Sequence, residues 1–376
     1  TLFRSYYDFM KILRILIIRF LIRIVRIFYR AKSDNNAKLA NDPRIDPRIK
    51  KNFWFDLPPR EHFKDRDEMM KYHNSAYIKK EIRLFEKFSE IYDDIKIAPK
   101  KGLIIETKKV KSHPDGNIIN LQFIRPDNEE ILPCIYYIHG GGMEYLSCYY
   151  GNYRAWGRLL AHQNVAVVMV DFRNATIPSS VPEVAEFPAG LNDCISGLKW
   201  THENSNLLKI DKSKIIVAGE SGGGNLTLAT GMALKKENNI SLIKGLFALC
   251  PYIAGIWPLE SNPSSITNNG IFLDLNDNPG PIAYGIQELH NKNPLAWPGF
   301  ASIEDVQGLP PTCIHVNECD PLRDEGYNFY RLLKEAKVET VFTEAMGTIH
   351  GTELFVTMCP DVSIKAAKDI AKFSRS

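Results

Sequence analysis

The sequence predicts an α/β fold in which a mostly parallel sheet is covered by helices on both faces. From residue 102 onward, short apolar and β-branched runs alternate with stretches of helical periodicity, a pattern typical of parallel strands joined by crossover helices. The run 215–218 is followed by a tight glycine-rich turn and then by apolar residues at helical spacing. With 376 residues the chain can form one large α/β domain with additional segments.

The first thirty residues differ in charge from the rest of the chain. They hold seven basic residues and one acidic residue, so the remainder has a net charge of −3. As a helix, residues 9–30 place four arginines within one arc, opposite an aliphatic face. Because arginines interrupt every apolar run, we expect a helix that lies on an anionic membrane surface and does not span a bilayer. A helix packed on its own protein and an organelle transit peptide are the alternatives.

Residues 31–100 lead from this segment toward the first strand. Residues 31–51 are polar and contain a tandem Asp-Pro-Arg-Ile at 42–45 and 46–49, which predicts an extended linker, because proline restricts the preceding residue to extended conformations. Residues 60–95 return to helical spacing, which predicts one or two surface helices. We therefore divide the chain into an amphipathic helix with its linker (1–40), an N-terminal helical cap region (41–100) and an α/β domain (101–376).

The elements of the sheet follow in order. Asp-Gly turn chemistry within 113–117 predicts a strand hairpin formed by 103–105 and 118–124. Residues 251–311 are rich in Pro, Asn and Gly and come directly after a strand, which predicts an inserted cap segment. Further strands are predicted at 134–138, 165–170, 215–218, 245–250, 312–316 and 339–345, and helices at 190–203, 223–236, 325–336 and 362–373.

Charge and cysteine spacing exclude several classes of protein. The net charge of the whole chain is only +3 and that of its body is negative, so we expect no nucleic-acid partner. The seven cysteines are scattered, several within apolar runs, and we expect them to be reduced in a cytoplasmic protein. Neither Cys-x-x-Cys nor His-Glu-x-x-His occurs, so no metal site is predicted.

The strongest candidate for a reactive side chain is Ser221. Gly219-x-Ser221-x-Gly223 lies between a β-branched run and a helical stretch, the setting of a nucleophile elbow, in which a strained turn exposes the serine hydroxyl. Taken alone the motif is weak, and a glycine-rich turn with an idle serine is the alternative.

Three other stretches could complete a site around this serine. Residues 139–142 (His-Gly-Gly-Gly) follow a predicted strand, and consecutive glycines present unobstructed N–H groups that suit a developing oxyanion. Of nine histidines, His350 is best placed as a base, in a loop after the last predicted strand. Asp320 follows another strand, whereas Asp324 and Glu325 lie nearer a helix start, where acidic residues act as caps. We therefore predict the triad Ser221, Asp320 and His350.

These motifs together resemble the hormone-sensitive-lipase-like family of α/β-hydrolase carboxylesterases, over roughly residues 40–360. The resemblance implies an α/β-hydrolase fold with a helical cap, and a serine esterase that acts on short or medium acyl esters without a cofactor. It also implies that the amides of Gly141, Gly142 and Gly222 bind the oxyanion. Two departures stand out: Glu220 and Gly222 occupy positions where Asp and Ala are commoner, and residues 171–177 (Asp-Phe-Arg-Asn-Ala-Thr-Ile) replace the family's Asp-Tyr-Arg-Leu-Ala-Pro-Glu.

Aromatic and apolar residues near these motifs predict an apolar cleft lined by Met143, Tyr145 and Trp257, with packing inside the cap as the alternative. No basic cluster lies near the motifs, so the expected partner is a neutral small-molecule ester. An amide deacylase or lactonase using the same triad, and a non-catalytic ligand receptor on the hydrolase scaffold, remain as alternatives. The sequence does not predict an oligomeric state.

Overall fold

The computed structural model describes residues 34–52, 61–276 and 279–376. Its centre is an eight-stranded sheet with the order β1-β2-β4-β3-β5-β6-β7-β8. The first two pairings, β1 with β2 and β2 with β4, are antiparallel, and all the others are parallel. The strands are β1 (Leu103–Lys111), β2 (Ile118–Pro126), β3 (Leu132–Ile138), β4 (Ala166–Asp171), β5 (Ile210–Glu220), β6 (Gly245–Leu249), β7 (Thr312–Asn317) and β8 (Thr340–Ala345). The predicted hairpin and the mostly parallel sheet are confirmed.

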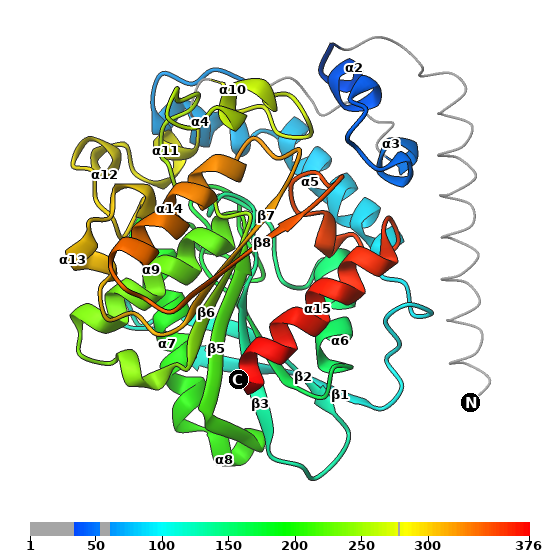
Figure 1. Cartoon of the computed structure of the whole chain (residues 1–376), viewed down its shortest axis with the longest axis vertical. Coiled ribbons are helices and arrows are strands. Elements are labelled where there is room, and N and C mark those ends of the chain that lie inside the picture. The colour runs from blue at the N-terminus through cyan, green and yellow to red at the C-terminus, as the bar shows by residue number, and fades with distance from the viewer. Residues whose placement is uncertain (1–33, 53–60, 277–278) are drawn as a thin grey trace.

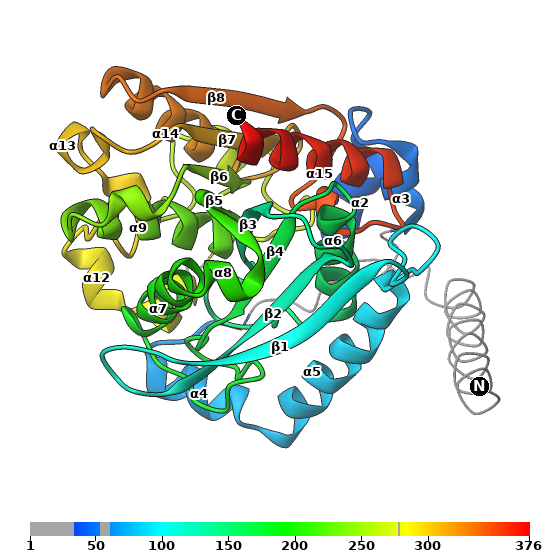
Figure 2. The same cartoon turned by 90° about the horizontal axis from the view of Figure 1, so that it is seen from below.

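Helices cover both faces of this sheet (Figures 1 and 2). On one face lie α6 (Gly151–Ala161) and α15 (Pro360–Arg375). The other face carries α7 (Ala189–Glu203), α9 (Gly222–Lys236) and α14 (Arg323–Glu335). Every residue of β4 is buried, as expected for a strand packed on both sides.

The remaining helices are shorter or lie outside these two layers. Near the N-terminus are α2 (Asp34–Asn41), α3 (Pro47–Asn52), α4 (Arg66–His73), α5 (Ala76–Ser89) and the 3₁₀ turn η1 (Glu90–Tyr92). Between β5 and β7 are α10 (Ser264–Thr267), α11 (Pro279–Tyr284), α12 (Ile286–His290), α13 (Ile303–Val306), and the 3₁₀ turns η2 (Ile240–Leu242) and η3 (Pro298–Phe300). The others are α8 (Ser205–Leu208) and η4 (Thr352–Leu354).

The prediction of an extended linker across residues 31–51 is wrong where the structure describes them, because α2 and α3 lie there. The second Asp-Pro-Arg-Ile unit starts α3: Pro47 is its first residue, and the carboxylate of Asp46 accepts the N–H of Arg48 at 2.7 Å. Proline suits the first helical position, where its missing N–H is not needed. This segment also packs inward, since Ile45 and Ile49 are buried together with Ile349.

The N-terminal helices meet the inserted segment at the top of Figure 1, where α4 contacts α11. The guanidinium of Arg66 donates to the carbonyls of Ala283, in α11, and Ala175, which follows β4. This side chain therefore ties the N-terminal helices to both the insertion and the sheet.

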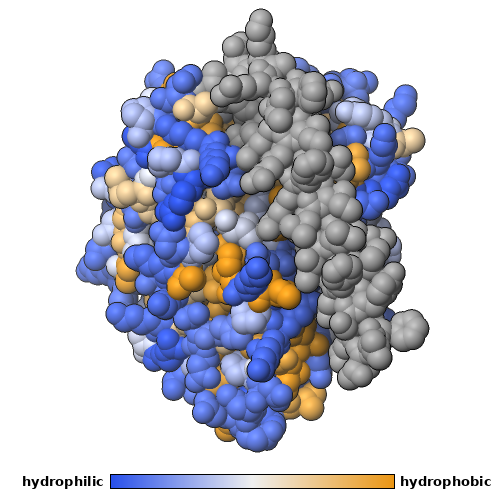
Figure 3. All heavy atoms as spheres, turned by 90° about the vertical axis from the view of Figure 1, so that its right-hand side faces the viewer, coloured by the Kyte–Doolittle hydropathy of each residue, from blue (hydrophilic) through white to orange (hydrophobic). Residues whose placement is uncertain are grey.

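The face shown in Figure 3 is mostly hydrophilic, with smaller apolar patches between charged side chains. Within the described part of the chain, none of the helices has the length and apolarity needed to cross a bilayer. The amphipathic helix predicted at residues 9–30 lies outside the described residues.

Candidate active site

Ser221 lies in the tight turn between β5 and α9, with φ 58° and ψ −121°. A non-glycine residue adopts this conformation only where its surroundings enforce it. Here the N–H of Ser221 donates to the Leu249 carbonyl at 2.9 Å, and its own carbonyl accepts the N–H of Tyr252 at 3.0 Å. A Cβ at Gly223 would overlap the carbonyl oxygen of Ile138, so β3 and the start of α9 can approach only because residue 223 is glycine.

The Glu220 side chain joins this turn to the His-Gly-Gly-Gly loop. Its buried carboxylate accepts the N–H of Gly140 at 2.6 Å, the hydroxyl of Tyr137 at 2.6 Å and the hydroxyl of Tyr153. Burial raises the pKa of Glu220 to about 7, although these three hydrogen bonds favour the charged form. Residue 220, one of the departures from the family pattern, therefore connects the nucleophile's turn directly to the glycine loop.

The glycine loop passes very close to the residue after the serine. Gly141 and Gly142 both have positive φ, 95° and 63°. A Cβ at Gly222 would lie 2.7 Å from the nitrogen of Gly142 and 2.6 Å from that of Met143. This contact favours glycine at 222 over the commoner alanine, because a Cβ there would push the loop away from Ser221. His139 is a structural anchor, fully buried and stacked on Phe172 with ring centroids 4.3 Å apart.

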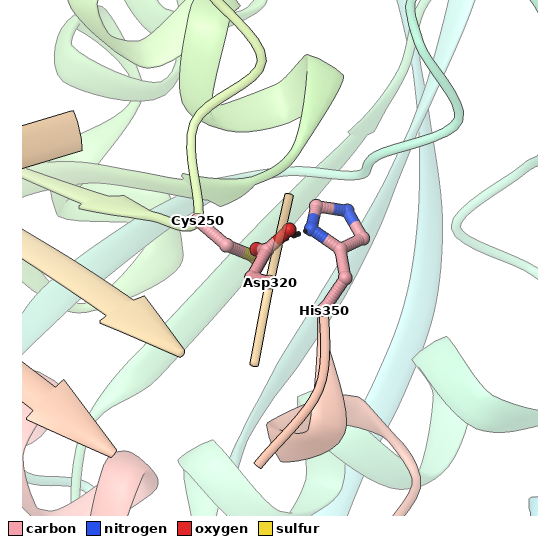
Figure 4. Close-up of side chains that lie close together, drawn as sticks. All are labelled: Cys250, Asp320 and His350. Carbon is pink, nitrogen blue, oxygen red and sulfur yellow. Dashed lines mark hydrogen bonds and ion pairs between the residues drawn. The ribbon is translucent and has the colours of Figure 1, made fainter. Parts of the chain in front are cut away.

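The structure brings Asp320 and His350 together (Figure 4). Their Oδ2 and Nδ1 atoms lie 2.7 Å apart, and both side chains are buried. Burial opposes the charged imidazolium, but the Asp320 carboxylate outweighs it, so the pKa of His350 lies well above its ordinary value. The second oxygen of Asp320 accepts the N–H of Leu322 at 2.9 Å, which fixes the carboxylate. Within the described residues no hydrogen bond joins Ser221 to His350, and such bonds commonly tighten only when substrate binds.

Cys250 is a third member of this cluster that the sequence analysis treated only as a core residue. It comes directly after β6 with φ 34°, and its N–H donates to the His315 carbonyl at 2.7 Å. Its sulfur, one Asp320 oxygen and one ring nitrogen of His350 all lie within 4.8 Å of one another. Its position at the carboxyl edge of the sheet was the available signal, since side chains of neighbouring parallel strands converge there.

A buried polar network behind His350 was also missed. One oxygen of Glu353 accepts from Asn317 at 2.8 Å and lies 3.0 Å from Nε2 of His315. Asn317 also donates to the hydroxyl of Thr348 at 2.8 Å. His315 and Asn317 belong to β7, so this network ties the His350 loop to the strand that precedes Asp320.

The three residues predicted to contact substrate occupy different environments. Tyr145 is 43% exposed, whereas Met143 and Trp257 are only 1% and 2% exposed. Trp257 stacks on Tyr252 with centroids 4.3 Å apart and donates to Glu325 at 2.7 Å, so it packs within the insertion. Tyr145 alone of the three presents substantial surface, and its contact with a substrate stays a prediction.

The acidic residues set aside as helix caps hold the insertion in place. Asp324 accepts the N–H of Ser264 at 2.7 Å, and Glu325 accepts that of Ile253 at 2.7 Å. Burial raises the pKa of Glu325 to about 8. Both carboxylates lie in the first turn of α14 and bind the inserted segment 251–311.

Comparison with known proteins places the chain in a family. The family described as alpha/beta hydrolase fold matches residues 135–354. Over 203 residues the chain is 34% identical to an arylesterase of Saccharolobus solfataricus, covering 52% of this chain and 61% of that protein. It is 31% identical over 261 residues to the carboxylesterase NlhH of Mycobacterium tuberculosis, covering 65% and 74%.

Solved structures agree over most of the chain. The esterase Est22 is 56% identical with a TM-score of 0.87, covering 90% of this chain and 99% of its own. Brefeldin A esterase, described as a bacterial homologue of human hormone-sensitive lipase, is 32% identical with a TM-score of 0.78, covering 91% and 96%.

The fold and these relatives define the class as carboxylic ester hydrolases. The chain belongs to the alpha/beta hydrolase family and to its hormone-sensitive-lipase-like branch, as the motifs predicted.

Proposed function

We propose that the protein is a serine carboxylesterase that works through an acyl-enzyme intermediate. The observation that carries this proposal is the buried Asp320–His350 pair, with Nδ1 and Oδ2 2.7 Å apart, at the sheet edge where the strained turn of Ser221 lies. A carboxylate on Nδ1 keeps the proton there and leaves Nε2 free to act as a base.

In the first step the Ser221 hydroxyl attacks the ester carbonyl while Nε2 of His350 takes its proton. The Asp320 carboxylate stabilises the imidazolium that forms. The negative oxygen of the tetrahedral intermediate is bound by the amides of Gly141, Gly142 and Gly222. The close approach of the glycine loop to Gly222 supports this assignment.

In the second half of the cycle His350 gives up the proton that it took from Ser221. The imidazolium gives its proton to the leaving alcohol, and an acyl group stays on Ser221. His350 then takes a proton from water, which attacks the acyl carbonyl, and the acid is released. The free enzyme is restored without any cofactor.

The substrates we propose are neutral esters of short to medium acyl chains. The relatives named as an arylesterase and as Est22 with p-nitrophenol support aromatic esters as test substrates. Tyr145, which follows the glycine loop and is 43% exposed, offers an aromatic surface for such esters. Rates measured across p-nitrophenyl esters of increasing acyl length, together with matched anilides and lactones, would define the bond and chain length.

The deciding experiment replaces the nucleophile. Ser221→Ala should lower kcat on p-nitrophenyl acetate by roughly five to six orders of magnitude. Ser213→Ala, at an exposed position on the same strand, is the matched control and should keep the parental rate. Near-parental hydrolysis by Ser221→Ala would refute the proposal, as would labelling of that variant by a fluorophosphonate at the parental rate.

We also propose peripheral membrane contact through residues 9–30, which carry arginines on one helical arc and aliphatic residues on the other. The full chain should sediment with anionic liposomes at low salt, and a variant without residues 1–30 should stay in the supernatant. Equal sedimentation of the two proteins would rule this contact out.

A further inference from the structure

The cluster formed by Cys250, Asp320 and His350 contains more chemistry than ester hydrolysis needs. The thiol is fully buried, and its sulfur lies within 4.8 Å of both a ring nitrogen of His350 and a carboxylate oxygen of Asp320 (Figure 4). In the proposed hydrolysis Cys250 neither accepts nor donates a proton, so the mechanism leaves the thiol without a role.

We propose that this cluster binds a thiophilic divalent cation, Zn²⁺ or Cd²⁺, and that the bound cation inhibits the enzyme. A thiolate, an imidazole nitrogen and a carboxylate oxygen are the three ligand types that zinc takes in proteins. In a tetrahedral zinc site the ligand atoms lie roughly 3.3–3.6 Å apart, as follows from metal–ligand distances near 2.0–2.3 Å. Nδ1 and Oδ2, now 2.7 Å apart, would separate by about 0.6 Å to hold such an ion. The sulfur, within 4.8 Å of its two partners, would approach them by about 1 Å at most.

Cys250 takes part in an arrangement that does not recur within the part of the chain that the structure describes. It is the only group of three or more His, Cys, Asp or Glu residues there whose ligand atoms converge in this way. The backbone of Cys250 is held at φ 34°, a conformation that a non-glycine residue rarely adopts. Its N–H donates to the His315 carbonyl at 2.7 Å, so the backbone that carries the thiol is held at the end of β6.

Binding would block the base by moving a proton. In its neutral form, the form that can act as a base, the imidazole carries its proton on Nδ1, toward Asp320. A cation that takes the Nδ1 lone pair forces this proton onto Nε2, while the thiol releases its own proton to solvent. The overall change is one cation bound and one proton released, with no electron transferred. Nε2 then carries hydrogen and can no longer accept the proton of Ser221.

Access to the cluster leads through the His350 loop. Cys250 and Asp320 are completely buried, whereas His350 keeps 5% of its surface exposed. The same loop is packed through Ile349 and hydrogen-bonded through Thr348, so it must open before a cation can enter. We therefore expect inhibition to develop slowly during incubation with the cation and to reverse slowly with EDTA.

The first experiment measures inhibition by Zn²⁺ on p-nitrophenyl acetate after incubation, with each variant compared with its own metal-free rate. Cys250→Ala and Cys250→Ser should each raise the half-inhibitory concentration at least 30-fold, through loss of the thiolate ligand. Cys194→Ala is the matched control, because Cys194 is equally buried but lies outside the cluster, and it should be inhibited like the parent. Inhibition of both Cys250 variants at the parental concentration would overturn the proposal.

The second experiment separates binding from hydrolysis, because inhibition rests on the proposed role of His350 whereas binding does not. Ser221→Ala is titrated with Cd²⁺, and the ultraviolet charge-transfer absorption of a cadmium–thiolate bond is recorded. The band should appear with one cation per chain and be absent from Ser221→Ala/Cys250→Ala. A band of equal strength in both variants, or none in Ser221→Ala, would refute the cation site even if the esterase proposal holds.

Discussion

Ser221 and His350 reach the same edge of the sheet through supports of different kinds. Ser221 is held by backbone: the strand before it, the helix after it and the carbonyl of Leu249 beside it. The loop of His350 is held by side chains from distant parts of the chain. Ile45 and Ile49 share one apolar cluster with Cys319 and Ile349, the residues immediately before Asp320 and His350. The nucleophile is thus encoded locally, and its partners depend on tertiary packing.

The largest expected effect breaks the backbone support of Ser221. Gly223→Ala would place a methyl group against the carbonyl oxygens of Ile138 and His139, which belong to the strand end and cannot move aside. We expect a loss of about 4 kcal/mol or more in the free energy of unfolding, because the overlap involves backbone on both sides. Urea unfolding followed by circular dichroism would measure it.

Gly231→Ala in the same helix is the matched control. There the nearest neighbours of the added methyl are side-chain atoms of Leu246, the closest at 2.5 Å, and alanine favours the helix by about 1 kcal/mol. We expect a change within about 1 kcal/mol. A similar loss for both variants would show that the close approach at residue 223 is not special to the serine turn.

The next effect tests the side-chain support of His350. Ile45 is 2% exposed, and truncation to alanine should cost roughly 2–4 kcal/mol through lost burial and the cavity left behind. Because Ile349 lies in the same cluster, Ile45→Ala should also lower kcat, while Ile131→Ala, at a position 72% exposed, should change neither quantity. If Ile45→Ala is destabilised but keeps the parental kcat, the N-terminal segment does not support the active site.

This contrast also explains which features the sequence revealed. The strand, turn and helix around Ser221, the Asp-Gly hairpin and the placement of Asp320 and His350 after strands follow from local rules of spacing and glycine content. The packing of Ile45 against Ile349 joins residues about 300 positions apart, and no local pattern encodes it. The same holds for Cys250 and Glu353, whose partners lie on other strands and loops. The prolines at 43 and 47 led to the wrong prediction of an extended linker, because proline favours an extended residue before it and is also common at the first position of a helix.

A third prediction concerns Glu220. Its side chain joins the Ser221 turn to the glycine loop, so this turn is supported by a side chain as well as by backbone. The pKa of Glu220 is raised to about 7, so between about pH 4.5 and 7 the folded protein holds a proton that the unfolded chain has released. The contribution of Glu220 to stability therefore falls as pH rises through this window. Glu220→Gln removes this dependence, and its free energy of unfolding relative to the parent should rise by roughly 2 kcal/mol from pH 5 to pH 7.

Urea unfolding at the two pH values would measure this difference, with Glu183→Gln, at an exposed position, as the control. The glutamine oxygen can still accept from Gly140 and Tyr153, while the Tyr137 hydroxyl can reverse and accept from the new NH₂ group, so glutamine should fit. A relative stability that stays constant with pH would mean that Glu220 is ionised throughout this range in the folded protein.

The smallest expected effect tests the polar support of His350. Glu353→Gln keeps the shape of the side chain and an oxygen for Asn317, but removes the negative charge beside His315. Its new NH₂ group replaces an oxygen that has no hydrogen-bond partner among the described residues, so it gains no acceptor. We expect kcat to fall about 10-fold, or 1.4 kcal/mol, with KM within twofold, because the loop that carries His350 is loosened while the substrate surface is unchanged.

The pKa of Glu353 sets the pH range in which its charge supports the His350 loop. Burial alone would raise the pKa of Glu353, but the hydrogen bond and charge of His315 lower it below its ordinary value. Its stabilising effect is therefore present at neutral pH and disappears as pH falls through that lowered pKa. Glu344→Gln, at an exposed position of β8, should leave kcat unchanged. If Glu353→Gln keeps the parental kcat at pH 7, the β7 network does not hold His350, and apolar packing alone supports that side of the site.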